Sequence, residues 1–155
     1  MVEIRPAGAA DADTLAELNA DIQAIHRAAH PWRFKPPSPE QFSREHVAKL
    51  VSNPNVSIVI ASAEGRSAGY AYWEFIQDDE TAFTYPDAVL YLHHVSVKPA
   101  FRRQGVGTAL MRHVQDQAEQ RGVKVVLDVW TVNEEALAFY ARLGFSRYRE
   151  RWWNR

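Results

Sequence analysis

The chain has no cysteine, almost no net charge and no long apolar run. Without cysteine there is no disulfide framework, no thiolate metal site and no cysteine nucleophile. A formal charge of −1 is too low for a general nucleic-acid binder, which usually carries a basic excess on one face. No apolar stretch reaches membrane-spanning length, and the first residues lack the layout of a signal peptide. We therefore expect a cytoplasmic protein with no nucleic-acid or membrane partner.

The residues that are present have the composition of an ordinary folded domain. Of the 155 residues, 46% are hydrophobic, 24% are charged and 12% are aromatic. This length can bury a core without help from metals or disulfides. We therefore expect a single domain over residues 1–155.

Hydrophobic spacing predicts strands and helices in the order β-α-α-β-β-β-α-β-α-β. The predicted helices cover residues 10–29, 38–51, 105–121 and 133–144. The predicted strands cover residues 2–5, 56–63, 68–76, a central strand that ends at 97, 123–131 and 145–153. This order indicates a mixed α/β sheet of about six or seven strands with helices on both faces.

The segment from residue 91 to residue 111 reads as strand, turn and helix. A β-branched run ends at Pro99, and a helical pattern begins near Gly105 after a basic turn. The first N–H groups of such a helix have no partner within the helix, and glycine lets an anion approach them closely. Arg102 and Arg103 add positive charge. The segment therefore predicts a phosphate-binding turn, to which Gly107 also contributes.

Two sequence motifs resemble those of the GNAT acyl-CoA N-acyltransferases. The first is Arg/Gln-x-x-Gly-x-Gly/Ala at the start of a helix, matched by Arg102, Gly105 and Gly107. The second is a pattern around a later helix, matched by Asn133, Ala136, Phe139, Tyr140, Gly144 and Phe145. The glycine pattern alone is weak evidence, but the two motifs occur in the family's order, separated by the expected helix and strand.

The resemblance implies acetyl-CoA as co-substrate. The family holds the pyrophosphate on backbone N–H groups, which here belong to Gln104, Gly105, Val106, Gly107 and Thr108. The pantetheine arm would pair with the backbone of Val95, Ser96 and Val97, near Asn133 and Phe139. Arg102 and Arg103 would flank the phosphates. Asn133 is expected to cap its helix as well.

The reaction needs a proton acceptor and a proton donor. An amine with a pKa of about 10.4 is mostly protonated at neutral pH, and the departing thiolate needs a proton. Tyr140 occupies the family's position for the acid. Three groups remain open as the base, namely His93, Asp128 and Glu74, beside a water relay. The backbone N–H of Val95 would stabilise the oxyanion.

Two histidines stand next to each other on the central strand. Strand alternation puts His93 on the face of Tyr91 and His94 on the opposite face, where a structural role is expected. A β-bulge at this point would reverse the assignment of His94. Tyr91-Leu92-His93 resembles the arylalkylamine N-acetyltransferases, but a tyrosine stands where they have the first histidine of a pair.

The acceptor site is predicted where unusual residues gather. Aromatic walls suit an apolar or cationic amine, although the same rings could instead pin the proline-rich connection to the sheet. His26 and His30 have a spacing that could bind a metal, but no third ligand is near in sequence, so we expect no metal. The candidates are His26, His30, Trp32, Phe34, Trp73, Glu74, Tyr85 and His93.

Two functions fit this sequence. The first is an N-acetyltransferase that acts on a small-molecule or peptide amine by direct attack, since no cysteine can carry the acetyl group. The alternative is a non-catalytic acyl-CoA-binding or sensing module, which the retention of Tyr140 and His93 disfavours. The aromatic, strand-like end at residues 151–155 is a candidate contact with another subunit, which would give a homodimer.

Overall fold

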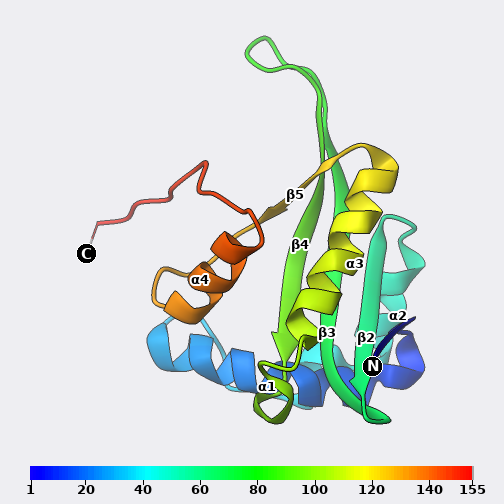
Figure 1. The fold of residues 1–155 in the computed structure, drawn as a ribbon. Helices are drawn as coiled ribbons and strands as arrows, with labels where there is room; N and C mark the ends of the chain where they lie inside the picture. The colour runs from blue at the N-terminus through cyan, green and yellow to red at the C-terminus, as the bar shows by residue number, and fades with distance from the viewer. Residues whose placement is uncertain (155) are drawn as a thin grey trace.

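The computed structural model describes residues 1–154. Arg155, the last residue of the predicted subunit contact at 151–155, therefore lies outside the described residues. One sheet has five strands in the order β1-β2-β3-β4-β5. They are β1 (Val2–Pro6), β2 (Val56–Ala63), β3 (Arg66–Asp78), β4 (Asp87–Val97) and β5 (Lys124–Leu127). Adjacent strands from β1 to β4 are antiparallel to each other, and β5 runs parallel to β4. The sheet is therefore mixed, as predicted (Figure 1).

Four α-helices cover the two faces of the sheet. They are α1 (Ala12–Ala29), α2 (Arg44–Ser52), α3 (Val106–Arg121) and α4 (Glu134–Arg142). Short 3-10 turns at Ala9–Asp11, Pro39–Phe42 and Pro99–Phe101 connect them to their neighbours. The predicted second helix is split at Ser43, whose extended backbone ends the first turn and whose hydroxyl accepts a hydrogen bond from the His46 N–H.

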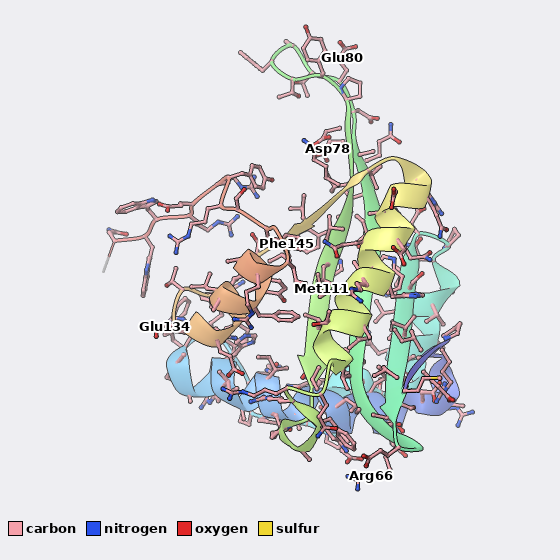
Figure 2. All side chains as sticks on the ribbon, in the orientation of Figure 1. Arg66, Asp78, Glu80, Met111, Glu134 and Phe145 are labelled. Carbon is pink, nitrogen blue, oxygen red and sulfur yellow. The ribbon has the colours of Figure 1, made fainter. Side chains whose placement is uncertain are left out.

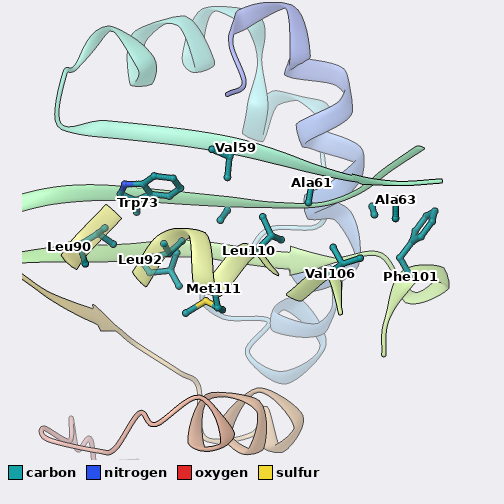
Figure 3. Packing of buried hydrophobic residues seen from close by; sticks show 14 residues of the cluster. Val59, Ala61, Ala63, Trp73, Leu90, Leu92, Phe101, Val106, Leu110 and Met111 are labelled. Carbon is teal, nitrogen blue, oxygen red and sulfur yellow. The ribbon is translucent and has the colours of Figure 1, made fainter. Parts of the chain in front are cut away.

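The alternation of β2 supplies side chains to a separate core on each face. Ile58 and Ile60 point toward α1 and α2, where they pack with Tyr70. Val59 and Ala61 point the other way, toward α3 and a fully buried Trp73. Figure 3 shows this second core between the strands and α3. Helices on both faces are thus confirmed.

The prediction of six or seven strands is wrong. The sheet has five, and residues 145–153 form no strand in the described chain. The predicted strand at 123–131 is also shorter, because only Lys124–Leu127 pairs with β4. Alternating side chains favour an extended backbone, but a strand also needs a partner for its hydrogen bonds. Within this chain residues 145–153 lie outside the sheet (Figure 1).

Gly69 lets two central strands come close together. A Cβ atom added there would lie 2.5 Å from the carbonyl oxygen of Ser96 and 3.3 Å from Leu110 Cδ1. Because the nearest obstacle is backbone, the strands themselves would have to move. We expect Gly69→Ala to lower the free energy of unfolding by about 1–3 kcal/mol, measured by urea denaturation. Gly8→Ala is the control, since nothing lies within 4 Å of that position, and equal losses would contradict the assignment.

Candidate active site

The site is built around a fork between β4 and β5. The two strands pair from Val89 and Lys124 to Leu92 and Leu127, and then β5 ends. β4 continues to Val97, paired only with β3 on its other side. In Figure 1 the chain after β5 turns away from β4 toward α4. One backbone edge of residues 93–97 therefore faces no other strand of the described sheet, which is an arrangement that can receive an extended, amide-rich chain.

The predicted anion-binding turn lies at the end of this open edge. Gly105 has a left-handed backbone with φ of 82°, and α3 begins at the next residue. Ala109 N–H donates to the carbonyl oxygen of Gly105, so the N–H groups of residues 106–108 precede the first full helical bond. The Arg102 guanidinium donates to the Val97 carbonyl oxygen at 3.2 Å. The Arg103 side chain is exposed and adds positive charge.

Gly107 lies where the start of α3 comes close to α4. A Cβ atom there would lie 3.3 Å from Phe139 Cζ and 3.7 Å from Val97 Cγ2. The missing side chain thus lets α4 pack against the start of α3. Phe139, expected at the cofactor, contacts this glycine position. Of the two glycines, only Gly105 has open space around its Cβ position.

α4 carries Asn133 at its start and Tyr140 two turns later. The Asn133 side chain accepts a hydrogen bond from the Ala136 N–H at 3.1 Å, which confirms the helix cap. The Tyr140 ring packs between Phe139 and Phe145, at centroid distances of 5.4 and 5.8 Å. Burial raises the pKa of Tyr140 to about 12. The hydroxyl therefore keeps its proton at neutral pH, as a proton donor must.

A β-bulge in β4 brings both histidines to one face. Tyr72 pairs with His94 and Trp73 pairs with Leu92, so His93 has no residue opposite it. The His94 ring packs against Phe42, Tyr70 and Tyr72 on the α1 side of the sheet. The expectation that His94 faces away from His93 is therefore wrong, and the bulge is the reason.

His93 and Glu74, two of the base candidates, contact each other. His93 Nε2 lies 3.1 Å from Glu74 Oε2, and both side chains are about one-third exposed. The Tyr72 ring stacks on the imidazole at 4.6 Å, and the Tyr91 ring meets it edge-on at 4.7 Å. The imidazole is thus fixed on two sides and can exchange protons with solvent on another. Sequence reasoning missed Tyr72, although its place two residues before Glu74 puts both on one face.

Asp128, the third base candidate, has a different partner. The Tyr91 hydroxyl donates a hydrogen bond to the Asp128 carboxylate. Asp128 comes directly after Leu127, the last residue of β5 that pairs with β4, so this contact joins the two strands. Burial, together with the hydrogen bond and negative charge of Asp128, raises the pKa of Tyr91 to about 12. The pair therefore bridges the two strands at the base of the fork.

His94 belongs to a buried polar chain. Its Nδ1 lies 2.9 Å from the Tyr70 hydroxyl, which donates to the Asn19 side-chain oxygen at 2.9 Å. Burial, together with the charges of His93 and His26, lowers the pKa of His94 to about 4. The imidazole is neutral at physiological pH and holds β4 to α1, which is the structural role expected for it.

The low pKa of His94 predicts that stability is lost in mild acid. The unfolded chain protonates this histidine near its ordinary pKa of 6.5, whereas the folded chain does so only near 4. The unfolded state therefore binds more protons in this interval, and the free energy of unfolding falls as the pH drops through it. The loss should approach roughly 3 kcal/mol at pH 4.

Urea denaturation of the wild type and His94→Gln at a series of pH values measures this loss. Between pH 6.5 and 4 the free energy of unfolding should fall more steeply with decreasing pH in the wild type than in His94→Gln. His46→Gln, an exposed change on α2, should retain the wild-type slope. A wild-type slope in His94→Gln would contradict the assignment.

An aromatic cluster lies beside these titratable groups. We give this name to His26, His30, Phe34 and Trp130. His30 lies 4.4 Å and Phe34 lies 5.3 Å from the Trp130 ring, and His26 lies 4.9 Å from Phe34. Sequence reasoning missed Trp130, which stands two residues after Asp128 and looked like part of a longer strand. The cluster thus brings the end of α1 next to the segment that follows β5.

Three other predicted acceptor residues have different surroundings. Trp32 is exposed and stacks on Trp153 of the chain end at 5.5 Å. Trp73 is only 1% exposed and lies in the core under α3, so its place in an acceptor pocket is a wrong prediction. Tyr85 is 87% exposed in the connection between β3 and β4, which projects away from the fork (Figure 1). Its assignment to an acceptor pocket at the fork is therefore also wrong.

The described residues were searched for metal-binding groups and for membrane-spanning helices. Within residues 1–154 no three histidine or acidic side chains are arranged to hold a metal ion. No helix among these residues is long and apolar enough to cross a membrane.

The chain resembles curated N-acetyltransferases in sequence. It is 31% identical over 125 residues to the [Ribosomal protein bS18]-alanine N-acetyltransferase of Escherichia coli K12, covering 79% of this chain and 70% of that protein. It is 33% identical over 138 residues to N-alpha-acetyltransferase RimI of Mycobacterium tuberculosis, covering 89% and 74%.

Solved structures share the fold. The BH1408 protein of Bacillus halodurans matches with a TM-score of 0.93 at 19% identity, covering 99% of this chain and 98% of that one. AAC(6')-Iy, solved with a CoA-containing bisubstrate analogue, matches with a TM-score of 0.74 at 20% identity, covering 100% and 97%. The family model of the GNAT acetyltransferases matches residues 19–145, a span that holds the fork, the turn before α3 and all of α4. This chain therefore belongs to the GNAT acetyltransferase family.

Proposed function

We propose that this protein transfers an acetyl group from acetyl-CoA to a primary amine by direct attack, within a single domain. The observation that carries the proposal is the open edge of β4 beside the turn before α3, together with a protonated, partly buried Tyr140 on α4. An extended pantetheine arm can pair with such an edge, and a helix start with Gly105 can bind phosphate. The cofactor positions of the family thus suit the residues present here.

His93 and Glu74 together form the proposed proton acceptor. The amine nitrogen forms a bond to the acetyl carbon, and the bond from that carbon to sulfur breaks. His93 takes the proton that the amine loses, while Glu74 fixes the orientation of its ring. Tyr140 protonates the departing thiolate, and the Val95 N–H stabilises the charge on the carbonyl oxygen. All of the proton transfers are thus assigned to groups of this chain.

The acceptor is proposed to bind on the α1 side of the fork. The carboxylates of Glu74 and Asp128 favour a cationic amine, and the rings of Tyr72 and the aromatic cluster offer apolar and cation-binding faces. The relative from Escherichia coli is named for an alanine of a ribosomal protein, and the relative from Mycobacterium tuberculosis is named for N-alpha-acetylation. A peptide α-amine is therefore a suitable first test substrate beside small amines.

The test is CoA release with a panel of small amines and peptides, followed by mass spectrometry of the acceptor. We expect a stoichiometric gain of one acetyl group by at least one amine. Acetyl-CoA binding without turnover across the panel would contradict the proposal and favour a sensing module.

Asp128 is proposed to act through position rather than as the base. Tyr91→Phe removes its hydrogen bond while leaving the ring beside His93. If the Tyr91–Asp128 contact only sets the width of the fork, then Tyr91→Phe and Asp128→Asn should both raise the KM for acetyl-CoA several-fold with little change in kcat.

Steady-state kinetics of these two variants separates the alternatives. If Asp128 is the base, Asp128→Asn should instead lower kcat by about 10²-fold or more, and Tyr91→Phe should not. That outcome would overturn the positioning role.

A further inference from the structure

The segment after α4 returns to the acceptor side of the protein. This segment, residues 146–154, begins beyond the labelled Phe145 in Figure 2 and carries its side chains along an extended chain. The Trp153 ring stacks on the Trp32 ring at a centroid distance of 5.5 Å. Trp32 also meets His30 of the aromatic cluster edge-on at 6.0 Å. The segment is therefore held against the end of α1, next to the proposed acceptor site.

Two arginines of this segment have no ion pair. Glu150, the only acidic residue of the segment, lies 3.7 Å from the Arg147 guanidinium and accepts a hydrogen bond from the Trp152 indole N–H at 3.1 Å. Arg149 and Arg151 are exposed, and neither forms an ion pair within residues 1–154. A guanidinium can bind a carboxylate through two parallel hydrogen bonds. Both side chains are thus available to an anionic group of a ligand.

The charges of these two arginines reach the proposed reaction site. Burial, together with the hydrogen bond and negative charge of Asp128, raises the pKa of Tyr91 to about 12, and the positive charges of Arg149 and Arg151 oppose this rise. Charges in solvent are screened within about 8 Å at physiological ionic strength, so the guanidinium groups lie near Tyr91. The Tyr91 ring in turn meets the His93 imidazole edge-on at 4.7 Å. The two arginines therefore lie close to the proposed proton acceptor.

Arg33 adds a third positive charge on this side. Its Cζ atom lies 5.7 Å from the centroid of the Trp130 ring, and Trp130 follows Asp128 by two residues. The Arg33 side chain is exposed and forms no ion pair among the described residues. The acceptor side therefore combines the carboxylates of Glu74 and Asp128 at the fork with uncompensated arginines beside it.

We propose that the acceptor is an amine that also carries a carboxylate, with its amine at His93 and its carboxylate bound by Arg149 and Arg151. This inference rests on the proposed acetyl transfer and leaves the bonds made and broken in that reaction unchanged. Free amino acids and peptides with an acidic residue near the N-terminus share the required chemistry. In either source, the two opposite charges of the acceptor match two oppositely charged parts of the site.

Matched acceptors with and without the carboxylate test this specificity and distinguish the two sources. One pair is phenylalanine and phenylalaninamide, and the other is the peptide amides Ala-Asp-Phe-NH2 and Ala-Asn-Phe-NH2. In at least one pair, kcat/KM should be about 10-fold higher for the carboxylate, chiefly through a lower KM. The carboxamide of phenylalaninamide lowers the pKa of the neighbouring amine, a bias that works against the expected result. Equal or higher kcat/KM for the uncharged member of both pairs would overturn the inference.

Removal of the two guanidinium groups tests which residues carry the preference. Arg149→Gln with Arg151→Gln should raise the KM of the preferred carboxylate acceptor about 10-fold and leave kcat and the kinetics of its uncharged partner unchanged. Arg112→Gln, an exposed change on α3, is the control and should keep the wild-type preference. The uncharged acceptor also shows that the double variant is folded and active.

Two results with the double variant would contradict the assignment. One is a wild-type preference for the carboxylate, and the other is an equal loss of activity with both members of a pair. Failure of the proposed function looks different, since no amine of either pair, nor of the wider panel, would then gain an acetyl group by mass spectrometry. That result would overturn the acetyl transfer and this inference with it.

Discussion

Replacing Tyr140 with phenylalanine is expected to lower kcat by about 10²–10³-fold while leaving the KM for acetyl-CoA nearly unchanged. The change removes only the hydroxyl, so the ring can keep its packing between Phe139 and Phe145. The pKa of about 12 keeps the hydroxyl protonated across the neutral range. Loss of this proton donor should therefore slow the departure of the thiolate rather than the binding of the cofactor.

Steady-state kinetics of CoA release measures this effect, with Tyr148→Phe as the matched control. Tyr148 lies in the segment after α4 and is 75% exposed, so the same loss of a hydroxyl there should leave kcat unchanged. An unchanged kcat in Tyr140→Phe for every active amine would remove Tyr140 from the role of acid.

The second large effect is expected at His93. His93→Gln should lower kcat/KM at neutral pH by about 10²-fold, because glutamine can keep a polar contact with Glu74 but cannot accept the proton of the amine. Glu74→Gln should have a smaller effect of about 10-fold, since the imidazole would remain stacked on Tyr72 with a weaker partner.

The double variant tests whether the two residues act as one unit. If they do, His93→Gln with Glu74→Gln should be no slower than His93→Gln alone. His46→Gln on α2 is the control for an exposed histidine. If the losses of activity in the two single variants multiply in the double variant, or if His93→Gln keeps full activity, the pair is excluded as the proton acceptor and a water relay is favoured.

The parts of the site that sequence could predict are those that depend on local geometry. The left-handed Gly105, the cap at Asn133 and the two-turn spacing to Tyr140 each follow from a few neighbouring residues. Such features need no knowledge of which strands pair. This is why the turn before α3 and the helix α4 were predicted close to their observed bounds.

The parts that sequence could not predict depend on pairing between distant segments. One unpaired residue in β4 moved His94 to the other face of the sheet, because strand alternation reverses at a bulge. The contact between His93 and Glu74 likewise requires the register of β3 against β4. The predicted last strand failed for a related reason, since an alternating pattern does not reveal whether a partner edge is available.

The acceptor site was also predicted only in part from the sequence. The proline-rich connection brings Phe34 and His30 together as the sequence suggested, but both rings also contact Trp130, which follows β5 by three residues. Trp73 and Glu74 were both assigned to the pocket, although neighbours on a strand face opposite sides. Only the structure shows that the tryptophan belongs to the core and the glutamate to the site.

A crystal structure with acetyl-CoA would test the central claim most directly. We predict that the pyrophosphate lies on the N–H groups of residues 104–108 and that the pantetheine arm pairs with the open edge of residues 95–97. We also predict that the sulfur lies within hydrogen-bonding reach of the Tyr140 hydroxyl, at about 3–3.5 Å. Binding of acetyl-CoA away from the fork, or with its sulfur far from Tyr140, would contradict the account.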